Sequence, residues 1–433
     1  MIFNEKMECM VLPEMKRLQS ERLKKLVQYL ESGPAFYKKK FDAHKVSSDK
    51  INSIDDIKKL PFTVKEDLRD SYPFGLFSQP VRNIGEIHIS SGTTGNPTVV
   101  GYTKSDIDLW SEVMARSIAL AGGMPGDMIQ IAYGYGLFTG GLGFHYGSMK
   151  LGLAIIPCSS GQSKRQLKIM NDLKPRILAC TPSYCLYLAD EAREMGLDPR
   201  RSSWEIGSFG AEPWTDAMRA EIEKTWDMSA TDVYGLSEIT GPGVAHECHL
   251  KTGLHIQHDV FFPEILNPKT GEDAKPGEPG ELVITTLTKE GMPLIRYKTR
   301  DIVSIERGTC ACGRTSPKIS KIRGRTDDMI IVRGINVFPS QIEHVLLQIE
   351  GTKPHYQLIV DRKERELDEL EVLVEVEEKI FSDEMSKLKQ LEDRIRNEIA
   401  SILGVSAKVR LVEPKTIERS EGKAKRVVDK RKI

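Results

Sequence analysis

The sequence lacks the features that mark several large classes of protein. It contains no G-x-x-x-x-G-K-[ST] run, which excludes a Walker A nucleotide loop. No apolar run approaches the length that crosses a bilayer, and the N-terminus "MIFNEKMECMVLPEMKRLQSERLKK" is too charged for a signal peptide. Lysine and arginine balance aspartate and glutamate at 62 each, so no general nucleic-acid footprint exists. These absences predict a cytoplasmic protein without a membrane or nucleic-acid partner.

Cysteine is also scarce. The seven cysteines form an odd set in a chain of 433 residues with no secretion signal, which argues against a disulfide framework. The chain is long enough, and its apolar content of 39% is high enough, for two or three domains that each have a hydrophobic core.

The pattern of short apolar runs predicts the fold class. Between about residues 84 and 330, β-rich runs alternate with amphipathic stretches, as in an α/β fold built on parallel sheets. Between about 255 and 305, strands separated by Gly/Pro turns predict antiparallel pairing. We therefore predict a large α/β domain with parallel sheets and a small antiparallel β subdomain (1–326), followed by a small mobile α+β domain (327–433). A helix expected in the small domain carries an apolar stripe at helical period, which predicts core packing: Met385, Leu388, Leu391, Ile395, Ile399 and Ile402.

The segment "HISSGTTGNPTVVGYT" (88–103) concentrates Ser, Thr and Gly directly before a β-branched pair. Such a run exposes backbone N–H groups and hydroxyl donors together, which suits an oxyanion, above all a phosphate. Taken alone, the run is more typical of an ordinary polar hairpin loop.

Four further segments carry side chains that suit a nucleotide. "SFGAEPWT" (208–215) ends a strand in small residues, which lets a flat ring approach the backbone. In "DVYGLSEIT" (232–240), a tyrosine can stack on a base, a serine can bond a phosphate and a glutamate can bind Mg²⁺. "LIRYKTRD" with "RGRTDD" offers an aspartate and an arginine for ribose hydroxyls, and "ERSEGKAKR" (418–426) frames a lysine with glycine. Each segment alone is also compatible with ordinary solvated charges.

Their order along the chain resembles that of the adenylate-forming enzymes, the acyl-CoA synthetase superfamily. Within it, the sequence is most similar to the phenylacetate–CoA ligase family. The resemblance runs the whole length of the chain and rests on long phrases: "LPFTVKEDLRDSYPFGLF", "SSGTTGNPTVVGYT", "AYGYGLFTGGLGFHYG", "CTPSYCLYLA", "YGLSEITGPGVAHEC", "RGRTDDMIIVRGINVFPSQIE" and "RSEGKAKRV".

The resemblance implies a role for each matching residue. A phosphate-binding loop would hold the β- and γ-phosphates of ATP through Ser90, Ser91, Gly92, Thr93, Thr94 and Gly95. Adenine would lie beside Ala211 and Glu212 and stack on Tyr234, while Asp301 and Arg325 would bind the ribose and Gly210 would border the acid substrate. Ser237 would contact the α-phosphate, Glu238 would hold Mg²⁺, and Lys423 would be the adenylation lysine. Arg333 and Gly334 are weak candidates for the coenzyme A path, and Asp327 would be the hinge. Many relatives have a lysine where this chain has Asn96, which puts its phosphate affinity in doubt.

The reaction implied by the resemblance has two steps. A carboxylate attacks the α-phosphate of ATP, which gives an acyl-adenylate and pyrophosphate, and the thiol of coenzyme A then displaces AMP. Positioning and charge neutralisation are what such a step requires, and a carboxylate already ionised at pH 7 needs no general base. The expected partners are thus ATP, coenzyme A and a small carboxylic acid, and the assembly stays open, with a homodimer as one alternative.

The sequence constrains the identity of the carboxylic acid substrate less closely than that of the nucleotide. "YGYGLFTGGLG" (133–143) combines Tyr135 and Phe138 with five glycines, among them Gly140 and Gly141, which could form a flat slot for an aromatic ring. Gly-rich segments serve tight backbone packing equally well. The family resemblance favours phenylacetate or a related aryl-acetate.

Three of the seven cysteines lie in two segments that also carry histidine, "HECHLKTGLHIQH" (246–258) and "TCACG" (309–313). If "LKTG" is a hairpin turn, Cys248 and His255 lie directly opposite each other, at a Cβ spacing of about 5 Å. With Cys310 and Cys312 they would form a closed Cys₃His site, the pattern of structural zinc. His246 is the alternative fourth ligand, and buried free cysteine is the alternative explanation of the set.

Two rival functions remain. An adenylating enzyme that loads a carrier protein would need a docking surface, which the sequence does not reveal. A non-catalytic zinc-dependent interaction module would have no use for Glu238, Asp301 and Lys423 together.

Overall fold

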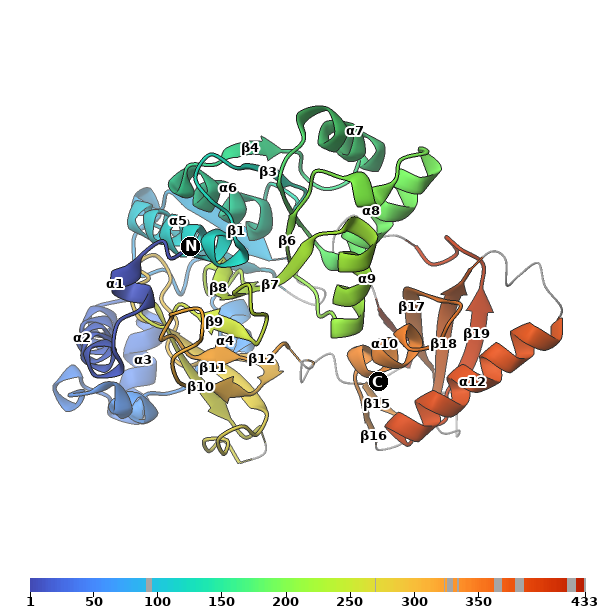
Figure 1. The fold of residues 1–433 in the computed structure, drawn as a ribbon. Helices are drawn as coiled ribbons and strands as arrows, with labels where there is room; N and C mark the ends of the chain where they lie inside the picture. Colours follow the sequence, from blue (N-terminus) through green and yellow to red (C-terminus); the bar gives the residue numbers. More distant parts are fainter. Residues whose placement is uncertain are drawn as a thin grey trace. The chain divides into compact units, whose positions relative to one another are not determined.

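The computed structural model describes residues 1–90, 96–268, 270–322, 324, 330–332, 335–361, 368–377, 385–418 and 426–431. The chain divides into two compact units (Figure 1). The first contains Met1–Cys180, Ser202–Ala211 and Met228–Lys321, and the second Thr181–Arg201, Glu212–Asp227 and Ile322–Ile433. Among the described residues, none of the helices is both long and apolar enough to span a membrane.

The first unit is built on a mixed sheet that has nine strands in the described part of the chain, in the order β13-β14-β9-β8-β7-β6-β5-β3-β4. Neighbours from β4 to β7 pair in parallel, and those from β7 to β13 pair antiparallel. The strands are β3 (Met128–Ile131), β4 (Ala154–Pro157), β5 (Ile177–Cys180), β6 (Ile206–Gly210), β7 (Ser229–Leu236), β8 (Gly241–Glu247), β9 (Leu254–Ile256), β13 (Ile305–Glu306) and β14 (Lys318–Ile319). The predicted parallel sheet is therefore present, but antiparallel pairing begins at β8, before residue 255.

Two smaller antiparallel sheets complete this unit. The first is the hairpin of β1 (Glu86–Ser90) and β2 (Thr98–Tyr102). The second pairs β11 (Gly280–Thr286) with β10 (Phe261–Leu266) and β12 (Tyr297–Val303), as the Gly/Pro-separated strands predict. β12 alternates buried and half-buried residues, which is the period-2 pattern of a strand with one face in the core.

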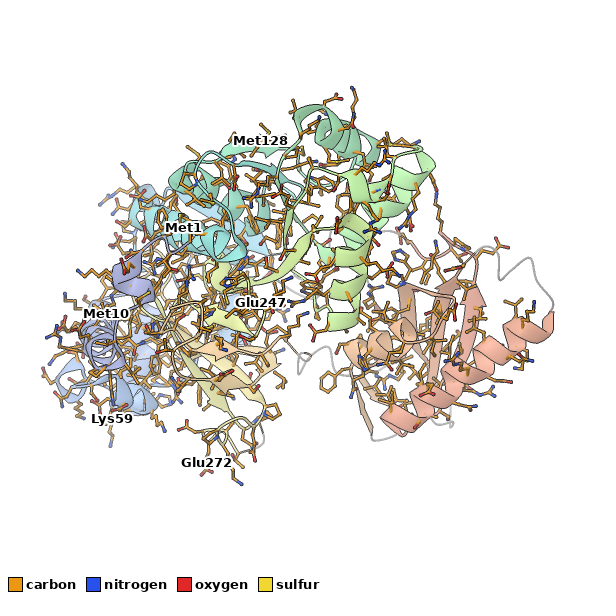
Figure 2. The ribbon with its side chains drawn as sticks, in the orientation of Figure 1. Met1, Met10, Lys59, Met128, Glu247 and Glu272 are labelled. Carbon is orange, nitrogen blue, oxygen red and sulfur yellow. The ribbon has the colours of Figure 1, made fainter. Side chains whose placement is uncertain are left out.

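Helices of the first unit concentrate in its N-terminal half. They are α1 (Glu5–Glu8), α2 (Leu12–Glu31), α3 (Ala35–His44), α4 (Lys65–Asp70), α5 (Lys104–Ala121), α6 (Thr139–Leu151) and α7 (Ser163–Leu173), with 3₁₀ turns η1 (Ser48–Lys50), η2 (Ile54–Lys59) and η3 (Val81–Asn83). Their buried faces follow the helical period, as in α2, where Leu23, Val27 and Leu30 are fully buried. Met1 and Met10, labelled in Figure 2, bracket the segment that contains α1.

The core of the first unit includes the interface of α5 and α6. A Cβ atom on Gly147 would lie 2.4 Å from Met114 Cβ, and one on Gly143 would lie 2.7 Å from the Trp110 ring. Because real Cβ atoms do not approach this closely, the two helices can pack at this distance only with glycine at these positions. Part of the glycine content of α6 thus serves helix packing.

The second unit contains a four-stranded sheet in its described part, in the order β19-β18-β17-β20. Two helices share its apolar core, which continues to a small hairpin of β15 and β16. The elements are α8 (Pro182–Glu194), η4 (Pro199–Arg201), α9 (Asp216–Trp226), β15 (Ile330–Val332), β16 (Ile335–Val337), α10 (Pro339–Leu347), β17 (Thr352–Asp361), β18 (Glu369–Val376), α12 (Met385–Leu403), β19 (Lys408–Val412) and β20 (Val427–Asp429).

The predicted apolar stripe of α12 is wrong at one position. Ile395 and Ile399 are fully buried and Leu391 packs against the same core, but Ile402 is 48% exposed and Leu403 is buried instead. The physical reason is that the buried face continues from Ile399 by a step of four residues rather than three. The side chain of Met385 lies outside the described residues.

Candidate functional site

A short turn after β7 carries two of the predicted phosphate and metal contacts. The N–H groups of Ile239 and Thr240 donate to the carbonyl of Leu236 at 3.0 and 3.1 Å, which closes a helical turn around Ser237 and Glu238. Both of these side chains are largely buried, and the Ser237 hydroxyl lies 3.2 Å from that of Thr139 at the start of α6. A carboxylate and hydroxyls are therefore gathered at one end of β7.

The structure also brings together the residues predicted to bind adenine and ribose. Tyr234 is in β7 and Asp301 in β12, and the tyrosine hydroxyl donates to Oδ2 of the aspartate at 2.5 Å. The Thr299 hydroxyl accepts from the backbone N–H of Asp301 at 3.1 Å, which helps to fix this part of β12. The two residues are 67 positions apart in sequence and adjacent in the fold.

The predicted phosphate loop connects the strands of the β1–β2 hairpin. Ser90 is the last residue of β1 and pairs with Thr98 of β2, whereas residues 91–95 lie outside the described part of the chain. The carbonyl of Leu137 accepts from the Ile89 N–H at 3.1 Å and lies 3.0 Å from Nδ1 of His88. The end of β1 is thus attached to the segment expected to form the aryl slot.

Gly210 and Ala211 have a backbone that larger residues would not tolerate. A Cβ atom on Gly210 would lie 2.2 Å from the carbonyl oxygen of Val233, because β6 and β7 approach closely there. Ala211 follows at a φ of 69°, in the left-handed region. In the second unit, the carboxylate of Glu212 accepts from the backbone N–H of Ser183 at 2.8 Å.

The glycine-rich segment at the start of α6 combines aromatic side chains with tight packing around its glycines. Tyr135 lies edge-on to His145, with its hydroxyl 3.3 Å from the Nδ1 atom, and Phe138 is 40% exposed. A Cβ atom on Gly140 would lie 2.7 Å from the Phe138 ring, and one on Gly141 would lie 2.7 Å from the carbonyl oxygen of residue 134. The space beside both glycines is thus filled by the protein itself, and the aromatic side chains remain as candidates to contact an aryl group.

The turn after β7 has two buried anchors that the sequence did not reveal. The ammonium group of Lys289 donates to the carbonyls of Ile239 at 2.8 Å and Glu238 at 3.3 Å, and the hydroxyl of Tyr102 donates to the backbone carbonyl of Ser237 at 3.0 Å. Burial lowers the pKa of Lys289 to about 8, against the opposing effect of Asp106 and Glu238. No local motif marks either residue, because each contact joins segments at least 50 positions apart.

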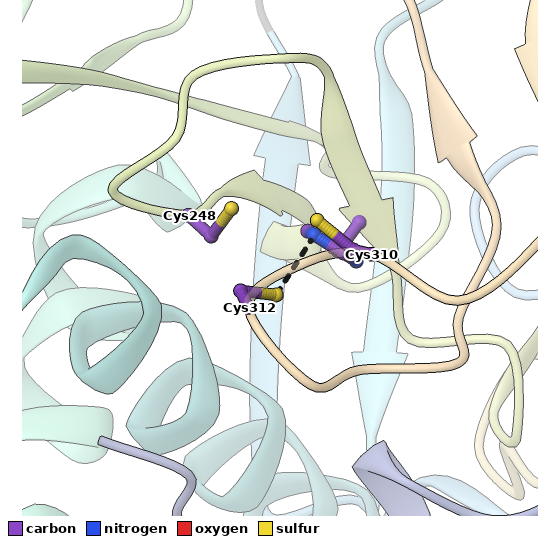
Figure 3. Close-up of side chains that lie close together, drawn as sticks. Cys248, Cys310 and Cys312 are labelled. Atoms are coloured by element: carbon purple, nitrogen blue, oxygen red, sulfur yellow. Dashed lines mark hydrogen bonds between the residues drawn. The ribbon is translucent and has the colours of Figure 1, made fainter.

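The predicted metal ligands form a cluster. Cys248, His255, Cys310 and Cys312 each present one ligand atom, and these atoms all lie within 4.8 Å of one another. Figure 3 shows the three cysteine side chains turned toward a common space. The Sγ atom of Cys312 lies 3.5 Å from Nε2 of His255, close to the separation of about 3.6 Å that a tetrahedral zinc imposes on a sulfur and a nitrogen ligand. The donor set and spacing fit a structural zinc ion.

The register that led to this cluster was predicted wrongly. In the structure His255 pairs with His246, not with Cys248, and Glu247 pairs with Leu254. The connection is longer than the assumed "LKTG" turn, because a turn closed by Lys251 N–H on the Cys248 carbonyl begins it and Gly253, with a φ of 129°, ends it. His246 is turned away from the cluster, with Nε2 2.8 Å from the Ser208 hydroxyl.

Neighbouring groups orient the cluster and set its charges. Nδ1 of His255 lies 2.9 Å from the Ser316 hydroxyl, which leaves Nε2 facing Cys312. Burial, together with the positive charges of Arg314 and Lys318, lowers the pKa of His255 to about 3, so the ring is neutral. Burial would raise the pKa of Cys312, but hydrogen bonds from the backbone and guanidinium of Arg314 outweigh it, and this pKa is lowered.

Arg314 joins this cluster to the N-terminal segment. Its Nη1 atom donates to Cys312 Sγ at 3.8 Å, while Nε donates to Glu8 at 2.5 Å and Nη2 donates to the carbonyl of Met1 at 2.7 Å. Glu8 also accepts from the backbone N–H groups of residues 3 and 4, at 2.9 and 2.7 Å. Both charged side chains are almost fully buried.

In addition to residues 91–95 of the phosphate loop, five predicted site residues lie outside the described part of the chain: Arg325, Asp327, Arg333, Gly334 and Lys423. The described residue Arg426 follows Lys423 by three positions and directly precedes β20. Its guanidinium carbon lies 4.4 Å from the centroid of the Tyr356 ring, and Nη2 lies 3.7 Å from a Glu343 carboxylate oxygen. The described chain that begins at Arg426 is therefore anchored by a buried ion pair.

Comparison with known proteins identifies the family. Residues 9–288 match the AMP-binding enzyme family and residues 334–431 match the AMP-binding enzyme C-terminal domain. The phenylacetate–coenzyme A ligase of Aromatoleum evansii is 50% identical, over 96% of this chain and 95% of that protein. That of Escherichia coli (strain K12) is 48% identical, over 100% and 99%. This chain belongs to the phenylacetate–CoA ligase family.

A solved structure agrees with this family assignment. The crystal structure of 2-hydroxyisobutyryl-CoA ligase in the postadenylation state, in complex with 2-HIB-AMP, matches with a TM-score of 0.93 and 28% identity, over 99% of this chain and 92% of that one. The predicted α/β fold and the predicted family are thus confirmed. The chain is an AMP-forming ligase of the adenylate-forming type, as its family membership and fold both indicate.

Proposed function

We propose that this chain joins phenylacetate to coenzyme A. A carboxylate oxygen of the acid bonds to the α-phosphorus of ATP as the bond to the bridging oxygen breaks and pyrophosphate leaves. The sulfur of coenzyme A then bonds to the acyl carbon, the acyl–oxygen bond breaks, and AMP leaves while the thiol proton passes to solvent. The proposal is supported mainly by the convergence of Tyr234, Ser237, Glu238 and Asp301 in a chain of this family.

Different residues of the first unit bind the adenine, the ribose and the phosphates of ATP. The Tyr234 ring offers a stacking surface for adenine, and its hydroxyl orients the Asp301 carboxylate, which accepts from ribose hydroxyls. Ser237 donates to the α-phosphate from the turn after β7. The loop that begins at Ser90 holds the terminal phosphates. Lys423, a residue of the second unit, stabilises the negative charge that develops on the α-phosphate.

The turn after β7 also suits Mg²⁺. Glu238 supplies a carboxylate from the same turn as Ser237, whose hydroxyl lies 3.2 Å from that of Thr139, so the available donors are the oxygens that this hard cation prefers. When bound, the ion neutralises charge on the phosphates of ATP.

The acid is proposed to contact Tyr135 and Phe138. Their rings offer aromatic faces and edges to a phenyl group, and residue 137, which lies between them in the chain, is attached to the end of β1. A ligase for another aryl-acetic acid, or an enzyme that loads a carrier protein, would use the same nucleotide residues.

A half-reaction assay tests the proposal. Purified enzyme, ATP and Mg²⁺ are mixed with phenylacetate, other aryl-acetates and short alkyl acids, and pyrophosphate and AMP are measured with and without coenzyme A. We expect pyrophosphate release with phenylacetate and AMP release only when coenzyme A is present. Preference for another acid would reassign the substrate, and AMP release that needs a carrier protein would reassign the acceptor. Light scattering on the same preparation measures the oligomeric state.

We also infer that the cluster of three cysteines and His255 binds a structural zinc ion. Three sulfurs and one neutral imidazole are the donors of a closed tetrahedral site, which leaves no position for a substrate. The ion would tie the loop after β8 to the loop before β14, two segments about 60 residues apart in the chain.

Elemental analysis of untagged protein tests the zinc site. We expect about one zinc per chain, lost in the Cys310→Ser variant and retained in the matched control Cys158→Ser, whose sulfur lies outside the cluster. Folded wild-type protein without zinc would refute the site. Full zinc in Cys310→Ser would reassign its ligands.

A further inference from the structure

Three consecutive carbonyl groups in the turn after β7 accept hydrogen bonds from two buried side chains. The Tyr102 hydroxyl bonds the carbonyl of Ser237, and the Lys289 ammonium bonds those of Glu238 and Ile239. In a helical turn the carbonyls point in one direction and the N–H groups in the other, and the carbonyl end carries partial negative charge. A cation at that end is favourable, and it fixes the direction in which the turn faces.

Lys289 is well suited to hold this position. Its side chain is 4% exposed, and its three N–H donors find two carbonyls and the face of the Tyr102 ring, whose centroid lies 4.4 Å from Nζ. Buried ammonium groups are costly unless they are satisfied in this way. The proposed reaction leaves this lysine without a role, because it faces the carbonyl side of the turn.

The backbone around Lys289 is itself fixed. Asp106 accepts from the N–H groups of Glu290 at 2.7 Å and Gly291 at 2.8 Å, and it also accepts from the N–H of Thr103 at the start of α5. The carboxylate of Glu290 accepts from the Thr103 hydroxyl at 3.1 Å. The ammonium group is therefore presented to the turn from a rigid support rather than from a free surface loop.

We propose that Lys289 is a positioning residue for adenylation, which holds the Ser237–Thr240 turn so that the Ser237 hydroxyl and the Glu238 carboxylate face ATP and its metal ion. The inference rests on the proposed role of this turn in nucleotide binding. Tyr102 is its partner, because it bonds the preceding carbonyl and supports the ammonium with its ring.

The test replaces the ammonium while keeping the length of the side chain. In Lys289→Met the carbonyls of Glu238 and Ile239 lose their cation, and a shift of about 1 Å in the turn is expected to lower the rate of adenylation about 100-fold. Calorimetric binding of Mg·ATP weakens and more Mg²⁺ is required, while the KM for the acid changes little. The matched control is Lys298→Met. Lys298 also lies over an aromatic ring, that of Phe62, but it belongs to β12 and lies away from the turn. We expect this variant to keep wild-type kinetics.

Thermal unfolding separates positioning from stability. If Lys289→Met lowers Tm but the folded enzyme keeps wild-type Mg·ATP binding and adenylation kinetics, the positioning role is refuted. If this variant fails to fold, Tyr102→Phe decides, because it removes only the bond to the Ser237 carbonyl and keeps the ring. We expect it to weaken Mg·ATP binding in the same direction by a smaller factor, and unchanged binding would overturn the proposal. Since calorimetry needs no acid, an error in the proposed acid substrate would not affect this result.

Discussion

The buried pair of Glu8 and Arg314 predicts that one N-terminal carboxylate contributes strongly to stability. In Glu8→Ala the guanidinium of Arg314 remains buried without its partner, and the N–H groups of residues 3 and 4 lose their acceptor. Removing one partner of a buried ion pair typically costs about 3–5 kcal/mol. Because both side chains are no more than 5% exposed, solvent does not screen this pair, and we expect a loss in that range for the first unit.

A second glutamate provides the matched control. Glu21 pairs with Arg17 at 3.9 Å on the exposed face of α2, with 60% and 79% of the two side chains accessible. Exposed pairs of this spacing contribute about 0.3–0.5 kcal/mol. Glu21→Ala should therefore leave the urea midpoint almost unchanged, while Glu8→Ala lowers it clearly.

Hydrogen exchange gives a second measurement on the same variants. Without the Glu8 carboxylate, Arg314 keeps only its bond to the Met1 carbonyl in this segment, so the amides of residues 1–10 should exchange faster, while those of the β1–β2 hairpin should not change. Arg314 also donates to Cys312, so a chelator should remove zinc faster from zinc-loaded Glu8→Ala. Equal urea midpoints for Glu8→Ala and Glu21→Ala would refute the reasoning.

Three further variants test the proposed chemistry. Lys423→Ala should slow adenylation about 10²–10³-fold, as loss of a transition-state donor does, yet spare thioester formation from preformed phenylacetyl-adenylate; equal losses would refute the role. Asp327→Pro, which fixes φ at the proposed hinge, should do the reverse, and a variant that retains both half-reactions moves the hinge elsewhere. Phe138→Ala should raise the KM for phenylacetate about tenfold by removing an aromatic contact, with no change for ATP; an unchanged KM for the acid locates the ring elsewhere.

The sequence predicted the elements whose periodicity is long and regular. The alternating strands of the parallel sheet and the helix α12 are found where their patterns indicate, because burial of one face repeats over several turns or residues. The burial of a single position at the end of such a pattern does not follow from the period alone. Ile402 and Leu403 are adjacent and equally apolar, and only the packing of the core decides which is buried.

The metal cluster was predicted from the types of ligand and from an assumed strand register, and only the ligand types agree with the structure. Cys248 reaches the cluster from the loop that follows β8, although the assumed four-residue turn gave the wrong strand pairing. Turn length depends on residues such as Lys251 and Gly253 that adopt positive φ, and a lysine at that angle leaves no signal in the sequence. The choice of His255 over His246 depends on Ser208, whose hydroxyl lies beside the His246 ring.

No functional motif marks the two supporting cations, Lys289 and Arg314, yet a common physical reason explains them. The Ser237–Thr240 turn and the Cys310–Cys312 loop are too short to satisfy their own polar groups. Each is therefore held by a buried cation from another segment, Lys289 or Arg314, and a buried cation requires acceptors fixed around it. Lys289 lies between two apolar stretches, "ELVITTLT" and "MPLI". Because both stretches are buried in the core, the lysine between them is buried as well. A lone basic residue between apolar runs is thus a candidate for such support, and it should be tested wherever a short functional turn needs an external partner.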